Sequence, residues 1–566
     1  MSFSVMTHRK QKFLTRLVWP VCLILLFLLH PPAAYANNLT ISNVRLLNQS
    51  DTGDTIVIEF DISWSNSWND STNHDGAWVF FKFKNTNTSP ATFGHIELKT
   101  AGTNPSGFSQ GSLGGSQYSS IDLVVPDDKK GVLIIPNQFG SGSINQTDVQ
   151  VVWDYAHESA LGDSTISDGS TYADAIGIEM VYIPEGGFFV GDGTDGSAAS
   201  SAAFEYGRDS SLPIPINSEN GLSFTDDTAG APYYNSSGGS LEFTDGYTFN
   251  VSSSYPKGFR AFYLMKYEIT EGQYVAFLNH LTRTAQNTRT AADVSTDTIT
   301  NYYVMTNKST MTNRNSIQAP SSGNGTLSPI TFLTDRSDRA TGYLGLGDML
   351  AYLDWAALRP MTELEYEKAA RGPVYPVNNE AAWGTTLLVQ ATSVSGGLGG
   401  EDGTETVLPA TAHVNYNNIT FTCTGTCDTQ TGPLRAGIFA KSTSTNREET
   451  GAGYYGNMEL SGNILEVIVT IGNSHGLKFT GSHGDGTLTT ASGFTGNATN
   501  SDWPGFDEAN TSRGCRYASG MGARGGDWKS NAAPQELSTS NRSNASATVT
   551  SRLSYGGGRG ARTAPF

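Results

Sequence analysis

The chain has 566 residues, of which 37% are hydrophobic and 16% are charged, and it contains 63 Gly and 22 Pro. This length favours two or more domains, and the Gly and Pro content argues against long helical bundles. The formal charge of −18 argues against nucleic acid as a partner, because binding to phosphates requires a surface of Lys and Arg.

The first 36 residues have the pattern of a secretory signal peptide. A basic stretch at 9–16 precedes an apolar run at 17–29, and Ala34-Tyr35-Ala36 fits a cleavage site. The apolar run contains Pro20 and is shorter than the roughly 20 residues that a membrane-spanning helix needs. We therefore expect residues 1–36 to be removed from an exported protein without a membrane span, which is secreted, periplasmic or held at the cell surface.

Residues 37–174 contain short apolar or alternating runs, separated by clusters of Asn, Asp, Ser and Gly. Such runs between turn-forming residues are typical of β-strands. The clearest strand candidates are residues 55–62, 77–83, 132–135 and 149–153. We predict an all-β sandwich domain over 37–174, which serves as a spacer or as a second binding unit.

The rest of the chain has few helix signals among long loops. Capping boxes at Thr270-Glu-Gly-Gln273 and Thr362-Glu-Leu-Glu365 each predict the start of a helix, and an apolar face predicts another helix at 348–357. Segments near 192–255 and 284–329 are rich in Gly, Ser, Thr and Asn. We interpret them as insertions on the surface of a compact fold.

Three Cys remain once the leader is removed. Cys423 and Cys427 are four positions apart around Gly425, and in an oxidising compartment this spacing favours a local disulfide. A zinc site would need two further Cys or His ligands nearby, and the sequence offers none at such spacing. Cys515 is left single, and we expect a buried, unreactive thiol.

Six segments stand in the same order as blocks of the formylglycine-generating enzyme (sulfatase-modifying factor) family. They are Met180–Gly191, Phe262–Asn279, Leu358–Gly372, Met458–Glu466, Arg524–Trp528 and Gly558–Arg562. The resemblance covers a domain over 175–566 and leaves out 37–174. It implies a C-type-lectin-like α+β fold with little regular secondary structure.

Family members that make formylglycine bind copper through two Cys shortly after a Gly-Gly-(Ser/Asp)-aromatic block and oxidise a sulfatase Cys. In this chain the matching positions are Ser530 and Gln535. Hydroxyl and amide groups cannot replace the soft thiolates that bind Cu(I), so we expect no copper and favour a non-catalytic protein. The alternative is an oxidoreductase of this type or a related metal-dependent oxidase, for which His475 and His483 have the closest ligand spacing.

The resemblance also implies a structural Ca²⁺. Carried over by position, its ligands are the side chains of Glu459 and Glu466 and the backbone carbonyls of Gly462 and Ile464. This set suits a hard cation, because Ca²⁺ binds oxygen and two carboxylates offset its charge. A second family calcium site would begin near Asn415.

These observations favour an exported binding or surface-assembly module with an extracellular or cell-surface ligand, either protein or glycan. Related lectin-like domains include variable proteins diversified by retroelements, in which a C-terminal segment carries the changing surface. Residues 529–554 contain 13 Ser, Thr and Asn among 26 positions, which suits such a face, although an ordinary surface loop is the alternative. The candidate ligand-binding residues are Trp528, Asn531, Asn541, Arg542 and Asn544.

Overall fold

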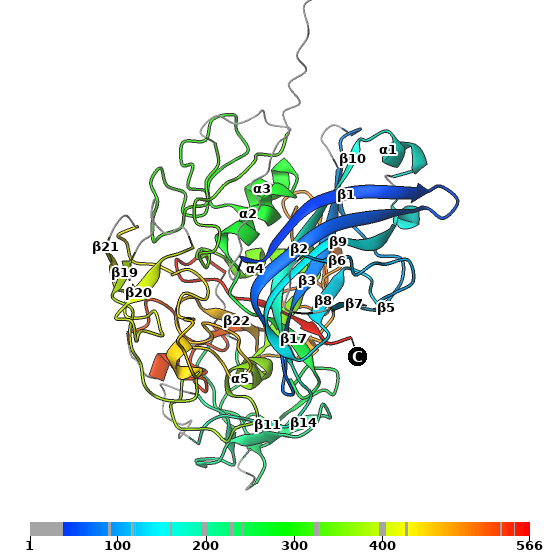
Figure 1. Ribbon diagram of the computed structural model, residues 1–566. Coiled ribbons are helices and arrows are strands. Elements are labelled where there is room, and N and C mark those ends of the chain that lie inside the picture. Colours follow the sequence, from blue (N-terminus) through cyan, green and yellow to red (C-terminus); the bar gives the residue numbers. More distant parts are fainter. Residues whose placement is uncertain are drawn as a thin grey trace, which may run out of the picture. The chain divides into compact units, whose positions relative to one another are not determined.

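A computed structural model describes residues 38–565, except for 89–91, 115–117, 119, 159–160, 194–201, 227, 229, 240, 321–327, 396–402, 425–427, 532–534 and 548–549. The described residues form a mixed α+β structure in which strands greatly outnumber helices (Figure 1). The predicted leader at 1–36 lies outside the described residues. So do Cys427 and the side chain of Cys423, so the predicted disulfide stays a prediction.

The helices are short, and two of them begin where the capping boxes predict. Thr270 caps α2 and Thr362 caps α5, in each case by accepting a hydrogen bond from the backbone N–H three residues later. The predicted helix at 348–357 begins two residues earlier than expected, as α4. The α-helices are α1 (Asp163–Ser167), α2 (Glu271–Asn279), α3 (Arg283–Arg289), α4 (Leu346–Trp355) and α5 (Glu363–Arg371). The 3₁₀ helices are η2 (Tyr155–His157), η3 (Glu448–Thr450), η4 (Gly476–Lys478), η5 (Thr511–Arg513) and η6 (Gln535–Leu537).

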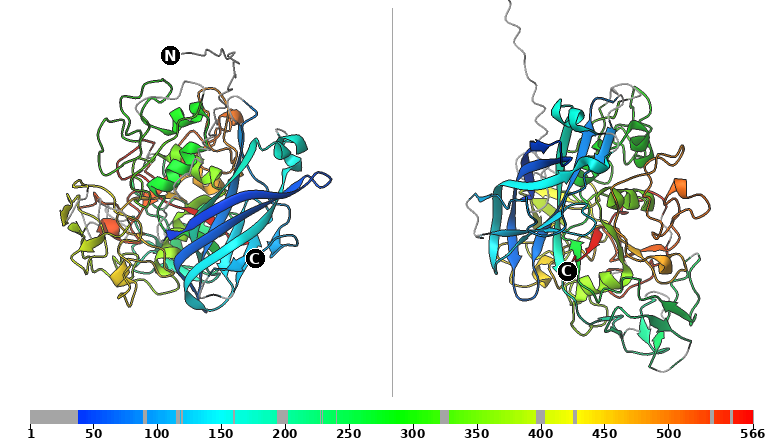
Figure 2. Two further views of the ribbon diagram at one scale, coloured as in Figure 1. Left: turned by 45° about the horizontal axis from the view of Figure 1, so that its top comes forward. Right: turned by 90° about the vertical axis from the view of Figure 1, so that its right-hand side faces the viewer.

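A two-layer β-structure forms where the sequence predicts a sandwich. One layer is a four-stranded sheet in the order β1 (Thr40–Ser50), β2 (Thr55–Asn69), β9 (Gly140–Asp154) and β6 (Ser112–Leu113). Its inward side chains pack against the second layer. For example, Phe60 meets Phe81 at 5.6 Å between ring centroids, and Trp153 meets Phe83 at 5.5 Å. In both views of Figure 2, these strands, coloured blue and cyan, lie side by side.

The second layer belongs to an eleven-stranded sheet that extends far beyond the sandwich. Its path runs through β23 (Met521–Arg524), β22 (Glu466–Val469), β18 (Arg359–Thr362), β24 (Gly560–Thr563), β17 (Phe262–Met265), β10 (Thr171–Ile183), β3 (Asp75–Asn85), β8 (Val132–Pro136), β7 (Ile121–Val125) and β5 (Gly102–Thr103), with β4 (Thr92–His95) beside β3. Strand β10 pairs with β3 on one side and with β17 on the other. The boundary predicted between residues 174 and 175 therefore falls inside a strand that both parts share.

Side chains from both parts also meet in a buried contact. The Trp78 indole donates to the Ala356 carbonyl at 2.8 Å, and its ring lies 4.0 Å from the Arg562 guanidinium carbon. Arg562 is fully buried and pairs with Asp128 at 2.5 Å. The Asp128 carboxylate also lies 3.4 Å from His483, whose pKa is lowered to about 4 by burial. The first part is thus joined to the second by backbone pairing and by buried charges.

The segments interpreted as insertions carry small elements of their own. A three-stranded sheet lies between residues 393 and 424, outside these segments, and three two-stranded sheets lie between residues 188 and 251. They are β11 (Phe188–Val190) with β13 (Ile214–Ile216), β12 (Glu205–Tyr206) with β15 (Pro232–Tyr233), β14 (Leu222–Phe224) with β16 (Phe249–Val251), and β20 (Thr406–Leu408) with β19 (Ser393–Ser395) and β21 (Thr422–Thr424). Phe204, Phe224 and Tyr234 of this region are buried in the main core, so the region is tied to the fold.

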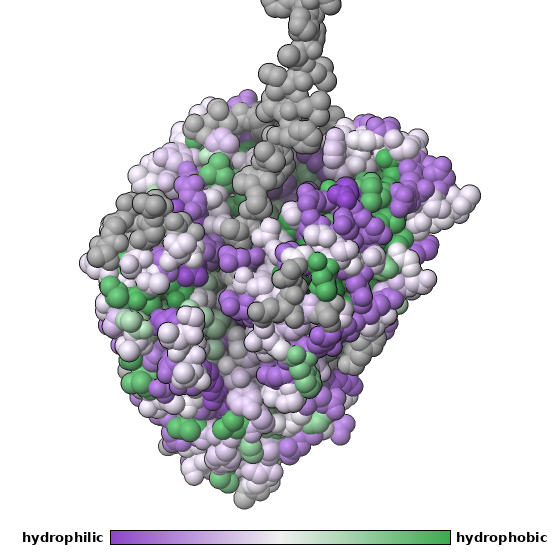
Figure 3. All heavy atoms as spheres, viewed as in Figure 1, coloured by the Kyte–Doolittle hydropathy of each residue, from purple (hydrophilic) through white to green (hydrophobic). Residues whose placement is uncertain are grey.

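On the face viewed in Figure 3, polar residues predominate and hydrophobic residues occur in small separate groups. Within the described part of the chain, each helix is too short or too polar to cross a lipid bilayer.

Candidate functional site

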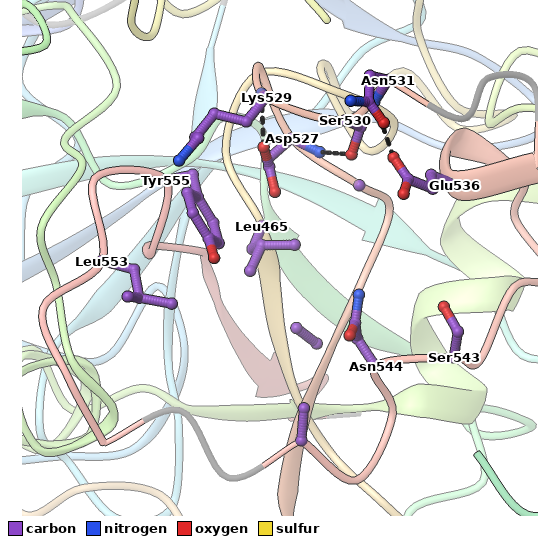
Figure 4. A pocket seen from close by; sticks show the side chains of 13 residues that line it. Leu465, Asp527, Lys529, Ser530, Asn531, Glu536, Ser543, Asn544, Leu553 and Tyr555 are labelled. Carbon is purple, nitrogen blue, oxygen red and sulfur yellow. Dashed lines mark hydrogen bonds between the residues drawn. The ribbon is translucent and has the colours of Figure 1, made fainter. Parts of the chain in front are cut away.

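A pocket of about 260 Å³ opens beside the end of β23. Eight of its thirteen lining residues come from the segment 529–554, which the sequence singles out for its small polar side chains. The lining residues are Leu465, Ala523, Gly526, Asp527, Lys529, Ser530, Asn531, Glu536, Ser543, Asn544, Ala547, Leu553 and Tyr555 (Figure 4). One continuous stretch of chain therefore builds most of the wall.

The backbone of this segment is held against the edge of the large sheet. The Ala523 N–H of β23 donates to the Asn544 carbonyl at 2.8 Å. Next to it, a Cβ built on Gly522 would lie 1.8 Å from the Ala545 carbonyl oxygen, so only Gly allows this approach. The Ser530 carbonyl accepts from the Asn417 N–H at 2.8 Å. Fixed hydrogen bonds thus hold the chain on both sides of the pocket.

A buried series of ion pairs, which we call the α5 ion-pair chain, also holds the segment 529–554 in place. It consists of Arg542, Glu363, Arg524, Glu367, Arg371 and Glu380. The residues Glu363, Glu367 and Arg371 are spaced by four, so they lie on one face of α5. Three guanidinium groups balance three carboxylates, which offsets the cost of removing them from water.

The α5 ion-pair chain also binds the segment's backbone and side chains directly. Arg542 donates from Nε to Glu363 at 2.8 Å and also to the Ala202 and Asn235 carbonyls. Arg524 donates to the Thr539 carbonyl at 2.6 Å, and Arg371 donates to the Ser540 hydroxyl at 2.8 Å. These contacts fix residues 539–542 as part of the scaffold.

The five candidate ligand-binding residues therefore separate into two groups. Asn531 and Asn544 are exposed and line the pocket. Trp528, Asn541 and Arg542 are buried, and the structure does not bring them to the pocket wall. Trp528 donates from its backbone N–H to the Asn463 carbonyl at 2.9 Å, so it connects the segment to the predicted calcium loop.

Asp527 is the most buried charged residue of the pocket, at 7% exposure. Its Oδ1 accepts from the Lys529 N–H at 2.6 Å, and Figure 4 shows its carboxylate pointing toward the space between Tyr555 and Leu465. Burial raises the pKa of Asp527 to about 6, against the opposing effect of that hydrogen bond. Sequence reasoning missed Asp527 as a site residue, although it lies inside the Arg524–Trp528 block.

Two further charged groups and one aromatic ring complete the pocket. Lys529 is exposed, and its Nζ lies 5.1 Å from the centre of the Tyr555 ring. Glu536 accepts from the Asn531 N–H at 2.9 Å on the far side of Ser530 (Figure 4). Leu465, Leu553 and Tyr555 provide an apolar wall opposite these polar groups.

The residues considered for oxidase chemistry do not come together in one site. Ser530 lines the pocket, whereas Gln535 is exposed at the start of η6. Cys515 is buried as predicted, and burial raises the pKa of its thiol well above the ordinary value. His475 contacts Asn473, while His483 contacts Asp128 and accepts from the Thr563 N–H.

The predicted calcium segment folds into a tight loop with positive φ at Glu459, Gly462 and Asn463. Glu459 accepts from the Gly437 N–H at 3.0 Å, and Glu466 accepts from Arg559 Nε at 2.6 Å. The second oxygen of each carboxylate is buried and has no hydrogen-bond partner among the described residues. Burial raises the pKa of both groups, to about 7 for Glu459.

A third buried carboxylate, Glu268, lies beside this loop and was not identified from the sequence. It accepts from the Asn463 amide at 2.6 Å and from the Ile464 N–H at 2.8 Å. Asn463 in turn contacts Asn415, where the second calcium site was predicted, at 3.0 Å. The two predicted calcium segments are therefore in direct contact.

The charge of this cluster suits a divalent cation, whereas its geometry suits one only in part. Three carboxyl groups, those of Glu268, Glu459 and Glu466, lie around the Arg559 guanidinium, and Arg435, which pairs with Glu405, also acts on Glu459. The two unpartnered oxygens could accept a cation. However, the described residues contain no group of three or more His, Cys, Asp or Glu side chains arranged to hold a metal ion. A cation here would have to draw Glu459 and Glu466 together.

Comparison of the chain with models of known protein families gave no match, and a search of curated proteins also gave none. The resemblance to the formylglycine-generating enzyme family therefore rests on the six sequence segments alone.

Proposed function

We propose that this protein is an exported, non-catalytic binding protein on a C-type-lectin-like scaffold of the formylglycine-generating-enzyme type. Its binding face is the pocket walled by residues 529–554. A separation within this segment carries the proposal: the backbone and the buried Arg542 are fixed by the scaffold, whereas Asn531, Ser543 and Asn544 project small polar side chains into the pocket. Adaptable polar side chains on a rigid frame are typical of binding surfaces.

The same separation supports diversification of this segment by a retroelement. The side chains of Asn531 and Asn544 can change without loss of the backbone hydrogen bonds and ion pairs that hold this segment. A reverse transcriptase gene and a near-copy of the segment's coding sequence beside this gene would support this origin. If both are absent from the surrounding DNA, the segment is not diversified by a retroelement and its binding face is invariant.

Filling the pocket tests the binding role. Asn544 is exposed at the rim, so Asn544→Trp should leave the melting temperature unchanged and block the pocket with a large ring. On an array of immobilised peptides and glycans, we expect ligands of the wild type to bind at least tenfold more weakly to this variant. Asn220→Trp, at an exposed position outside the pocket, is the matched control. Identical array profiles for all three proteins would refute the proposed face.

We also propose that the loop of Glu459 and Glu466 holds a structural Ca²⁺, supported by the three carboxyl groups gathered around Arg559 and by the two unpartnered carboxylate oxygens. The ion would draw on these side chains and on the carbonyls of Gly462 and Ile464. Its role would be to hold the loop that contacts Trp528, and so to steady the pocket wall.

Calcium should therefore raise the melting temperature of the wild type. At a hundredfold excess over the dissociation constant, the gain in free energy of unfolding is about 2.7 kcal/mol, because the ion binds the folded loop and scarcely binds the unfolded chain. Glu459→Gln is the sharper variant, because Glu466 also neutralises Arg559. It should lose most of the calcium response while keeping its stability in chelator. If the wild type melts at the same temperature in calcium and in chelator, the proposal that this loop binds Ca²⁺ is wrong.

A further inference from the structure

Building on the proposed binding role, we infer that the pocket receives a positively charged group of its ligand, a primary amine or a guanidinium carried by a peptide or protein. Asp527 is the acceptor for this group, and the apolar wall of Leu465, Leu553 and Tyr555 receives the aliphatic stem behind it.

The surroundings of Asp527 point to this ligand chemistry. Asp527 is only 7% exposed, and its carboxylate faces the pocket and accepts hydrogen bonds from the backbone N–H groups of Lys529, at 2.6 Å to Oδ1, and of Ser530. Among the described residues, no Lys, Arg or His lies within 4.0 Å of this carboxylate, and Lys529 is the positive charge that acts on it from farther away. A buried carboxylate without a direct ion pair is costly, so a cation that enters the pocket and contacts this carboxylate gains a strong interaction.

The aromatic wall already faces a positive charge. Lys529 Nζ lies 5.1 Å from the centre of the Tyr555 ring, within the range of a cation–π contact. A ligand amine would meet the same ring from within the pocket and compete with Lys529 for it. Because Lys529 is exposed, it can swing away into solvent.

The net charge of the pocket also favours a positively charged ligand. Asp527 and Glu536 outnumber Lys529, and these three are its charged lining residues. The whole chain adds a formal charge of −18, which attracts cations at long range and repels anions. An anionic ligand would have Lys529 as its partner, but it would then lie against two carboxylates.

Charge variants at Asp527 and Lys529 distinguish a cationic ligand from an anionic one. We would titrate the exported chain with the peptides acetyl-Gly-X-Gly-amide, where X is Lys, Arg, Gln or Glu, by ligand-observed NMR at low salt. The Lys and Arg peptides should bind at least tenfold more tightly than the Gln and Glu peptides. Asp527→Asn should remove that preference, and Lys529→Gln should strengthen Lys and Arg binding severalfold because an internal competitor is lost.

Two exposed positions outside the pocket provide matched controls for general charge effects. Asp127→Asn and Lys308→Gln change the net charge of the protein by the same amounts, and should leave all four affinities unchanged. Preference for the Glu peptide, lost in Lys529→Gln, would overturn the inference in favour of an anion site. Equal binding of all four peptides, or of none, would also overturn it.

These outcomes can be told apart from failure of the proposed binding face. If Asn544→Trp abolishes array ligands while the charge variants have no effect, the pocket binds a neutral ligand such as a glycan, and only the cation assignment is wrong. If neither the array nor the peptides respond to any pocket variant, the binding face itself is wrong. Lys529→Gln keeps the test valid if Asp527→Asn unfolds, because Lys529 is exposed.

Discussion

Replacing Arg542 by Ala should lower the free energy of unfolding by about 3–5 kcal/mol, since it removes one partner from a buried ion pair. Arg542 is fully buried, donates to Glu363 at 2.8 Å, and stacks 4.1 Å from the centre of the Phe204 ring. Without it, the α5 ion-pair chain has three carboxylates and two guanidinium groups in a space that excludes water. Urea unfolding of the wild type and the variant measures the difference.

Two further variants define the cause of that loss. Arg542→Lys keeps the charge but not the forked geometry that contacts Glu363 and two carbonyls together, so its stability should fall between those of the wild type and Arg542→Ala. Asn544→Ala, two positions along on the exposed rim, should change stability by less than about 0.5 kcal/mol. If Arg542→Ala has the same free energy of unfolding as the wild type, Arg542 is not part of the scaffold. The sequence-based prediction that it binds a ligand would then stand.

A chain that begins at residue 175 should fail to fold, unlike the chain that begins at 37. The truncation removes β3, the partner of β10 over eleven residue pairs, and exposes the middle of the large sheet. It also removes Trp78 and Asp128, which leaves the buried Arg562 without its counter-charge. We expect the truncated chain to show no cooperative thermal transition by circular dichroism.

A point substitution provides the matched test in the longer chain. Asp128→Asn keeps the size of the side chain but deletes the charge that pairs with Arg562, so it should destabilise the 37–566 chain strongly. Asp127→Asn, at the exposed neighbouring position, should not. Cooperative unfolding of the 175–566 chain at the melting temperature of the longer chain would show that the two parts are independent domains.

The sequence predicted the local elements well because their causes are local. Thr270 and Thr362 cap helices through side chains three residues away from their partners, and alternating apolar runs became β2, β3, β8 and β9. The burial of Cys515 was also predicted correctly. In contrast, no local pattern indicated that β10 would join two sheet regions, because pairing between strands depends on residues far apart in the chain.

The pocket was predicted in part, for the same reason. The composition of 529–554 indicated an adaptable surface, and Asn531 and Asn544 do line the pocket. Nothing local marked Arg542 as a scaffold residue, because its partner Glu363 lies 179 positions away. The capping box at 362–365 predicted where α5 begins, but it did not indicate that Glu363 of this helix would pair with the buried Arg524 and Arg542.

The sequence by itself determined the short-range features of this protein: the helix caps, the strand-forming runs and the polar composition of 529–554. Only the tertiary structure decided which polar residues line the pocket and which are buried in the scaffold. The physical reason is that the burial and pairing of a charged side chain depend on what packs against it. For Asp527, Glu268 and Arg542, those neighbours come from several distant segments of the chain.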